Sequence, residues 1–279
     1  MQKSFTVPSP VNLDVQLTSG TIEVDASSAS PNEVDVVLVA RSEEAQALVD
    51  AATIDLRGDT VIVDVPSRSR SWNLGGLLGR QDVHCRIRCP EGSSLRARSK
   101  SADVKGRGPL GDVDASSASG DVSVEDVRGD LSIKSASGDL SARSVAGRAS
   151  ANTASGDVDI DSVGGAVTAN TASGDVSIRS AGGDVRANSA SGDTNIGAVE
   201  RGTVAVNTAS GDVTIGVRRG TRVHLDCSTV SGDARSELDM DGDDSGGDGP
   251  FVDLKARTVS GDISITRAAA PAERQEVHA

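Results

Sequence analysis

The chain has 279 residues, a formal net charge of −13 at pH 7 and 1% aromatic residues. Such an acidic chain lacks the basic face that nucleic-acid binding needs, and no apolar run is long enough to span a membrane. The sequence also begins without the apolar segment of a signal peptide, which predicts a cytoplasmic protein with a narrow core of Val, Ile and Ala.

Residues 1–100 predict irregular β-strands at the N-terminal end of the molecule. Apolar and polar residues alternate from Val11 to Leu17, and residues 19–24 and 58–63 each resemble a turn followed by a strand. Between these segments, residues 42–52 begin with a capping Ser and early Glu residues, which predicts one short helix. We expect this region to form wide, interrupted coils that cap the fold.

One predicted loop, residues 67–80, departs from the acidic, small-residue character of the chain. It gathers arginines, leucines and the one tryptophan around a Gly-Gly pair. Such a cluster is typical of a docking surface for a protein partner or an anionic membrane face; the alternative is a flap that covers the core. The candidate partner-binding residues are Arg68, Arg70, Trp72, Leu74, Leu77, Leu78 and Arg80.

The three cysteines predict no disulfide. Cys85 and Cys89 lie four residues apart in an alternating strand, so their side chains share one face but are roughly 13 Å apart, beyond disulfide reach. We expect Cys227 to be buried as a small apolar residue.

Residues 101–267 carry a regular repeat. From Gly111 to Glu200 the period is nine residues, and three positions in each unit are apolar, with Thr194 as the one polar exception. Alternate units differ, so the structural repeat is an eighteen-residue coil with two strands. Ile recurs in one strand and Ala in the other, as a thin, dense core requires. The sequence therefore predicts an all-β fold, a single-stranded β-solenoid or β-helix with about 18 residues per coil.

A Ser-Gly-Asp sequence marks each coil. Gly can turn the chain through positive φ, and Asp can hydrogen-bond the turn amides. Stacked carboxylates repel by roughly 1 kcal/mol in water, whereas a charge-assisted hydrogen bond contributes about 1.5 to 3 kcal/mol. We therefore interpret the following residues as a structural turn ladder, with cation binding as the alternative: Asp121, Asp139, Asp157, Asp175, Asp193 and Asp212.

Calcium binding is the main alternative for the acidic residues. Calcium-binding β-rolls share the nine-residue period, but their turns need Gly-Gly-x-Gly-x-Asp, where this chain has one Gly and three apolar residues. An acidic insert at residues 237–249 resembles a calcium loop loosely and reads as a solvated loop. We expect no metal and no cofactor.

A second ladder combines Asn with a following Thr or Ser. Its asparagines would stack at one corner, where amides can hydrogen-bond one another. An ice-binding face would need two Thr per strand, and each strand has one. The ladder consists of Asn152, Asn170, Asn188 and Asn207. Residues 268–279 carry no repeat and predict a disordered tail.

The repeat pattern also supports a resemblance to a known family. Its SGDV and SGDL units, the GDL, GAV and GDV strands between them, and the Gly-rich Leu loop before them resemble the putative-adhesin family of bacterial β-strand-repeat proteins, also called the toastrack domain. The likeness covers nearly the whole chain and is most specific over residues 100–235. The resemblance implies a solenoid of largely unknown function, linked in some members to envelope-stress sensing, with no established catalytic residues.

No catalytic constellation stands out in the sequence. His84, His224 and His278 lack ligand spacing, and neither a phosphate-binding loop nor a nucleophile elbow is present. We therefore predict a non-enzymatic, cytoplasmic scaffold that binds a protein partner and no nucleic acid. One alternative is a bactofilin-like filament subunit, because a solenoid end is an open strand edge. A second alternative is a polysaccharide-binding or -cleaving β-helix.

Overall fold

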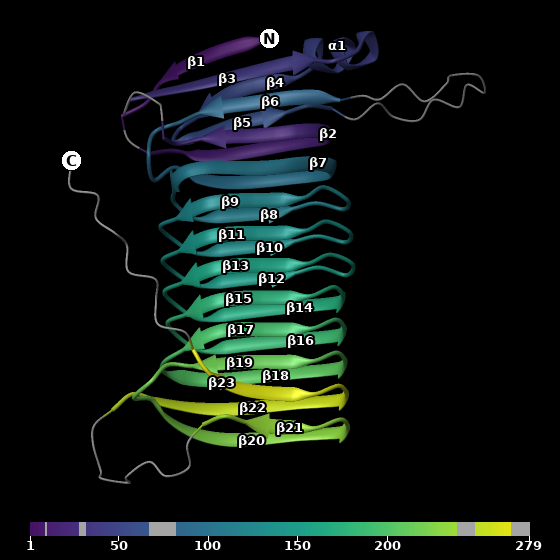
Figure 1. Cartoon of the computed structure of the whole chain (residues 1–279). Coiled ribbons are helices and arrows are strands. Elements are labelled where there is room, and N and C mark those ends of the chain that lie inside the picture. Colours follow the sequence, from purple (N-terminus) through teal and green to yellow (C-terminus); the bar gives the residue numbers. More distant parts are fainter. Residues whose placement is uncertain (9, 28–31, 67–81, 239–248, 269–279) are drawn as a thin grey trace, which may run out of the picture.

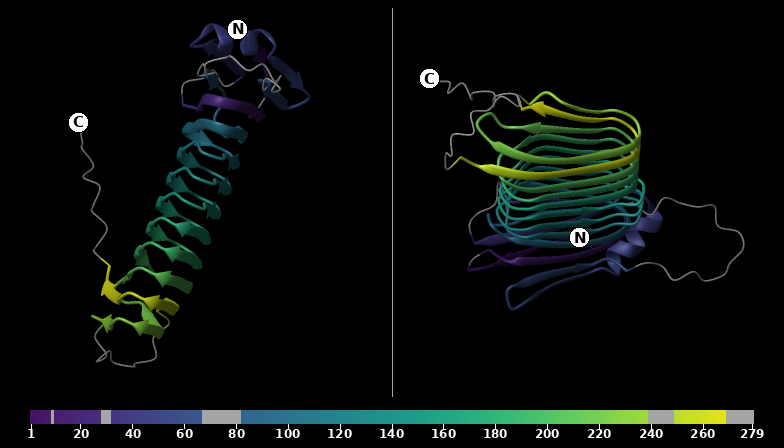
Figure 2. Two further views of the ribbon diagram at one scale, coloured as in Figure 1. Left: turned by 90° about the vertical axis from the view of Figure 1, so that its right-hand side faces the viewer. Right: turned by 90° about the horizontal axis from the view of Figure 1, so that it is seen from below.

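The protein is an elongated stack of β-coils with a short helix at its N-terminal end (Figure 1). The computed structural model describes residues 1–8, 10–27, 32–66, 82–238 and 249–268. The left view of Figure 2 shows that the stack is thin, as expected for a core nearly free of aromatic residues. The all-β solenoid predicted from the repeat is confirmed.

The regular part of the stack has two walls, and each coil contributes one strand to each wall. Pairing is parallel and in register between neighbouring coils, so that Val122, Leu140, Val158 and Val176 form one row. One wall contains β8 (Val113–Ser116), β10 (Leu131–Lys134), β12 (Ala149–Asn152), β14 (Val167–Ser173), β16 (Val185–Ser191) and β18 (Gly202–Ser210). The other contains β9 (Val122–Val127), β11 (Leu140–Val145), β13 (Val158–Val163), β15 (Val176–Ala181), β17 (Thr194–Val199) and β19 (Val213–Val217).

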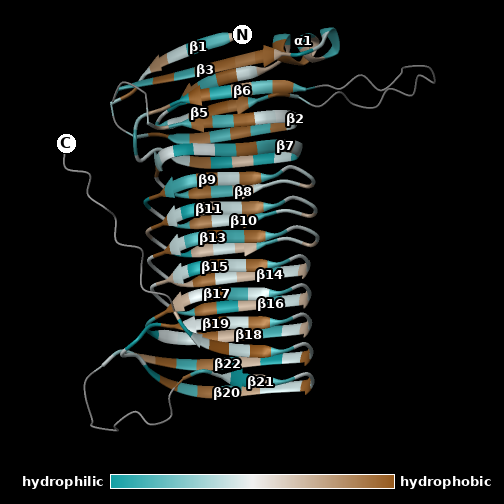
Figure 3. Cartoon of the chain, viewed as in Figure 1, coloured by the Kyte–Doolittle hydropathy of each residue, from teal (hydrophilic) through white to brown (hydrophobic). Residues whose placement is uncertain are grey.

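The core lies between the walls and is filled by alternate residues of each strand, which Figure 3 shows as alternating hydropathy along the strands. In one wall, consecutive coils align Ile160, Ile178, Ile196 and Ile215. The other wall aligns Ala151, Ala169 and Ala187. All seven side chains are at most 2% exposed, so large residues in one wall are accommodated by small ones in the other.

At the N-terminal end, stacking order differs from chain order. The long strand β2 (Asn12–Asp25) spans both walls and pairs in parallel with β7 (Ser94–Leu110), which continues into the regular coils. On its other side, β2 pairs with β5 (Thr60–Asp64) and β6 (Val83–Arg88). The outermost strands are antiparallel: β3 (Glu33–Ala40) on β6, β1 (Gln2–Thr6) on β3, and β4 (Thr53–Arg57) on β5.

The predicted short helix is present at this end as α1 (Glu43–Asp50). The Ser42 hydroxyl accepts a hydrogen bond from the backbone N–H of Ala45, as an N-cap should. Ala45, Leu48 and Val49 are buried, so the helix packs its apolar side against the N-terminal coils.

The C-terminal end also departs from chain order. The coil that is last in the sequence consists of β22 (Phe251–Ser260) and β23 (Ile263–Arg267). It pairs on one side with β18 and β19. On its other side it pairs with β20 (Arg222–Ser231) and β21 (Ala234–Ser236), which form the end of the stack although they precede it in the sequence. In the register, Ile263 and Ile265 lie beside Ala234 and Ser236. Both isoleucines are buried, whereas Ala234 and Ser236 are exposed, so the more apolar coil is inside and the more polar coil ends the stack.

Candidate functional site

The predicted Asp ladder runs along one corner of the solenoid. The carboxylates from Asp121 to Asp212 are exposed, and Oδ1 of each accepts the backbone N–H of the Asp in the next coil, at donor–acceptor distances of 2.8–3.0 Å. Each carboxylate thus bonds the neighbouring coil, whereas the sequence suggested a bond to its own turn. The ladder begins one coil earlier, at Asp103, and passes from Asp212 to Asp262 and then to Asp233.

This use of the carboxylates gives the ladder a structural role in the stack. A hydrogen bond from a backbone N–H to a carboxylate is charge-assisted and stronger than one between neutral groups. The part of the chain that the structure describes holds no group of three or more His, Cys, Asp or Glu side chains able to bind a metal.

From Asp121 onward, a Gly precedes each ladder Asp and permits close approach of the coils. At Gly174, φ is +152°, and a Cβ atom there would clash with the carbonyl group of Gly156 in the preceding coil. A larger residue would therefore meet backbone, which cannot move without breaking the ladder.

The predicted Asn ladder lies near the same turns. The side-chain amide of each Asn donates to the side-chain carbonyl of the one before it, at 2.7, 2.7 and 3.0 Å along Asn152, Asn170, Asn188 and Asn207. The Thr or Ser that follows each Asn is at most 8% exposed, so these hydroxyls lie inside the corner and offer no outer face.

The opposite corner carries a second, shorter series of carboxylates that the sequence analysis did not single out. Asp112 accepts the backbone N–H of Asp130. Asp130 in turn accepts hydrogen bonds from the backbone N–H and the guanidinium of Arg148, each at 2.8 Å. The hydrogen bond from the backbone N–H of Arg148 has the largest effect, and together with the guanidinium bonds it lowers the pKa of the Asp130 carboxyl below its ordinary value.

Several predicted features lie outside the described residues. They are the whole candidate partner-binding set, Arg68, Arg70, Trp72, Leu74, Leu77, Leu78 and Arg80, most of the acidic insert, and residues 269–279 of the tail.

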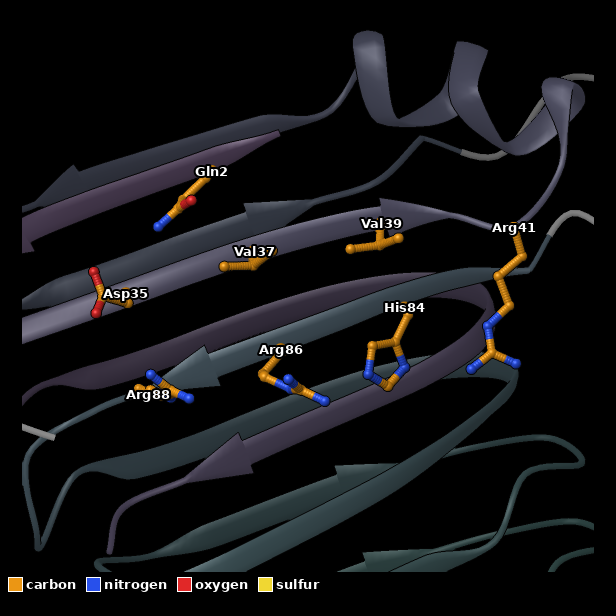
Figure 4. A pocket seen from close by; sticks show the side chains of 8 residues that line it. All are labelled: Gln2, Asp35, Val37, Val39, Arg41, His84, Arg86 and Arg88. Atoms are coloured by element: carbon orange, nitrogen blue, oxygen red, sulfur yellow. The ribbon is translucent and has the colours of Figure 1, made fainter. Parts of the chain in front are cut away.

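The structure adds a site that the sequence analysis missed. An open hollow with a volume of about 320 Å³ lies on the outer face of the N-terminal sheet, where β1, β3 and β6 meet (Figure 4). We call it the N-terminal hollow. It is lined by Gln2, Asp35, Val37, Val39, Arg41, His84, Arg86 and Arg88.

Strand register places apolar and basic side chains opposite each other in this hollow. On β3 and β6, which run antiparallel, Val39 is the partner of His84, and Val37 is the partner of Arg86. Val39 is 48% exposed, which is unusual on strands whose exposed positions are mostly polar. In Figure 4, Arg41 and Arg86 extend on either side of the His84 ring, while the valines line the neighbouring strand.

The electrostatics of the hollow depend on Glu23 of β2. Its carboxylate, 12% exposed, forms ion pairs with Arg107 at 2.8 Å and with Arg86 at 3.3 Å, and its Oε2 lies 3.4 Å from Nε2 of His84. By contrast, no described residue forms an ion pair with Arg41, and Nδ1 of His84 is buried without a hydrogen-bond partner in the described chain. The hollow therefore contains a guanidinium, that of Arg41, that no described carboxylate pairs with.

A second, more polar hollow of about 280 Å³ adjoins the first and shares Arg41 and His84 with it. Asp82 and Asp103 contribute to its lining, and Asp103 is the first member of the Asp ladder. The N-terminal hollow thus lies next to the start of the regular stack.

The sequence contained one signal for the hollow. Residues 84–88, HCRIR, alternate basic and apolar side chains, which is the pattern of a strand with a cationic outer face. The valines could not be assigned to the same site, because the pairing of β3 with β6 depends on antiparallel register between segments far apart in the sequence.

All three cysteines are free. Cys85 and Cys89 are buried, and burial raises the pKa of each thiol to about 12. Cys227 was expected to be buried but is only partly so, because its strand β20 belongs to the coil at the open end of the stack. Burial still raises the pKa of Cys227 above its ordinary value.

Comparison with known proteins bears on the fold. A family model described as Toastrack DUF4097 matches residues 11–266. The comparison with curated proteins finds no match. Among the helices of the described residues, none is both long enough and apolar enough to cross a membrane.

The solved structures that match this chain include proteins from Bacteroides and Parabacteroides. A putative adhesin from Bacteroides fragilis NCTC 9343 is 12% identical with a TM-score of 0.51, over 95% of this chain and 96% of that one. A putative adhesin from Parabacteroides distasonis ATCC 8503 is 11% identical with a TM-score of 0.47, over 95% and 96%. A putative lipid binding protein from the same strain is 14% identical with a TM-score of 0.40, over 96% of each chain. At this level of identity, the likeness to the first concerns the fold alone.

Proposed function

The chain belongs to the Toastrack family, and from this premise we propose that it is a non-enzymatic, rigid β-solenoid scaffold that holds a binding surface for another molecule. The family is one of unknown function, so the proposal depends on the chain's own architecture.

The observation that carries the proposal is the continuous Asp ladder. It adds a charge-assisted hydrogen bond between neighbouring coils from Asp103 to Asp233, in addition to the in-register strand pairing. Sliding or tilting one coil against the next would break both sets of bonds, and each repeat contacts only its neighbours. Such a stack is suited to holding a surface in a fixed place.

The hydrogen bonding of the polar side chains along the coils favours binding over catalysis. Along the coils, the ladder carboxylates and amides are already engaged in hydrogen bonds with their neighbours. A catalytic site needs a nucleophile or base that is free to exchange a proton with substrate. We therefore propose that the coils support a binding surface and have no chemical role of their own.

We place the binding surface at the N-terminal end. The N-terminal hollow lies there, and the predicted docking loop, residues 67–80, precedes Asp82, which lines the adjoining hollow. A location in the cytoplasm is part of the proposal, since free thiols are typical of reducing compartments. A link to envelope stress or adhesion, implied by the family resemblance, is proposed on that resemblance alone.

An affinity pull-down with mass spectrometry tests this function. Replacing Trp72, Leu77 and Leu78 with Ser should abolish recovery of the partner and leave the melting temperature nearly unchanged. The matched control replaces Val230 and Val259, which are 81% and 55% exposed at the other end of the stack, and should retain the partner. Equal recovery by both variants would contradict the proposed surface, and a fall of several kcal/mol in stability would identify the loop as a cover.

A second candidate function, a bactofilin-like filament subunit, is favoured by the C-terminal end. There β20 is an edge strand, and Val230 and Phe251 are 81% and 49% exposed. Open edges with exposed apolar residues can pair with another chain. The N-terminal end opposes such stacking, because its outermost strands β1 and β4 run antiparallel to their neighbours. We therefore retain the scaffold as the preferred function.

A further inference from the structure

We propose that the N-terminal hollow is a binding site for an anionic amphiphile: a carboxylate or phosphate group held between Arg41 and Arg86, with an aliphatic part lying on Val37 and Val39.

Charge favours an anion in the hollow of an otherwise acidic protein. The lining includes three arginines and His84 against one carboxylate, that of Asp35. A hollow on the regular coil wall has the opposite balance, with Arg143 facing Glu125, Asp159 and Asp161. Arginine donates paired hydrogen bonds that match carboxylate and phosphate oxygens.

Arg41 is available for such a contact. No described residue forms an ion pair with its side chain, whereas Arg86 shares the carboxylate of Glu23 with Arg107. Figure 4 shows the guanidinium groups of Arg41 and Arg86 on opposite sides of the His84 ring. An anion beside that ring would be near both cations. The carboxylate of Glu23 also lies 3.4 Å from Nε2 of His84, but its charge is already shared among three partners, His84, Arg86 and Arg107.

The apolar part of the ligand follows from the neighbouring strand. Val37 and Val39 point outward on β3 directly opposite Arg86 and His84. Val39 leaves 48% of its surface exposed, although outward positions on strands are usually polar. An inorganic anion would leave these valines in water, while an alkyl group attached to the anion would cover them. The combination therefore selects an amphiphile over a bare anion.

The test is equilibrium binding to the full chain, measured by calorimetry and by shifts of backbone amide resonances in β3 and β6. The probes are octyl phosphate and octanoate, with inorganic phosphate and the neutral octyl glucoside as controls. We expect the two anionic amphiphiles to bind, with affinity that falls as salt rises, and both controls to bind at least tenfold more weakly. Equal binding of inorganic phosphate or of octyl glucoside would overturn the proposal, as would the absence of binding at millimolar concentration.

Variants test the assigned residues without breaking a described ion pair. Arg41→Gln should weaken octyl phosphate binding at least tenfold, and Arg143→Gln, the same change on the coil wall, should have no effect. Val39→Thr keeps the shape of the side chain and should weaken octyl phosphate more than it weakens inorganic phosphate. Unchanged melting temperatures show that each variant is folded. Equal affinity of Arg41→Gln and Arg143→Gln for octyl phosphate would contradict the assignment of the site to Arg41.

Vesicles distinguish the two sources of such a ligand. If the protein sediments with phosphatidylglycerol vesicles but not with phosphatidylcholine vesicles, and Arg41→Gln abolishes this, the ligand is the head group of a membrane lipid. If octyl phosphate binds in the same Arg41-dependent way and the vesicles do not, the ligand is a soluble amphiphile. Sedimentation that Arg41→Gln leaves unchanged would contradict the site.

Discussion

Replacing Gly174 with Ala should destabilise the solenoid strongly. Gly174 has φ of +152°, and a Cβ atom would be driven into the carbonyl group of Gly156. Positive φ costs a residue with a Cβ about 1–2 kcal/mol, and overpacking against fixed neighbours costs typically 1–3 kcal/mol. The expected loss in the free energy of unfolding is therefore about 2–5 kcal/mol.

Gly58→Ala is the matched control, because it carries the backbone cost without the clash. Gly58 has φ of +63°, and nothing lies within 4 Å of the position that a Cβ atom would occupy. It should lose only about 1–2 kcal/mol. Urea unfolding followed by circular dichroism measures both variants. Equal destabilisation would refute the reasoning that close approach between coils requires glycine at this corner.

Three further predictions concern the ladder, the thiols and pH. Asp157→Ala should lower the free energy of unfolding by about 1 kcal/mol, because the inter-coil hydrogen bond of Asp157 is lost. A chelator should leave the melting temperature unchanged. A large rise in melting temperature with calcium would contradict the structural role of the ladder. A thiol reagent at pH 8 should modify Cys227 before Cys85 and Cys89, whose pKa values of about 12 keep them protonated, and equal rates in mass spectrometry would contradict their burial. The pKa of Asp130 is lowered in the folded protein, so its contribution to stability is present above its unfolded pKa of about 3.8 and is lost as pH falls through the folded pKa. The melting temperature of Asp130→Asn should therefore fall less on acidification than that of the wild type.

The regular coils could be predicted from the sequence because their determinants are local. Each eighteen-residue unit carries its own turn, strands and apolar positions, and Ile160 and Ile178 align merely because the period is constant. The α1 helix was also predictable, since Ser42 and the early Glu residues are adjacent in the chain.

The ends of the stack could not be predicted in the same way. The placement of β22 between β18 and β20 depends on which coil buries more apolar surface, and that comparison involves segments about fifty residues apart. The N-terminal hollow could not be predicted for the same reason, because Val39 lies beside His84 only through the antiparallel pairing of β3 with β6, which α1, β4 and β5 separate in the sequence. The sequence also could not show that each ladder carboxylate bonds the next coil instead of its own turn, because that choice depends on the distance between neighbouring turns in the folded stack.

Small-angle X-ray scattering over a range of protein concentrations tests whether the solenoid is a rigid and capped scaffold. At about 4.8 Å per coil, the twelve or so layers of the described residues predict a rod roughly 55–60 Å long. We expect the mass of one chain or of a small closed oligomer, and both this mass and the cross-section should stay constant as concentration rises. Rods that lengthen as concentration rises would show that the coil ends pair, and would contradict the scaffold in favour of a filament.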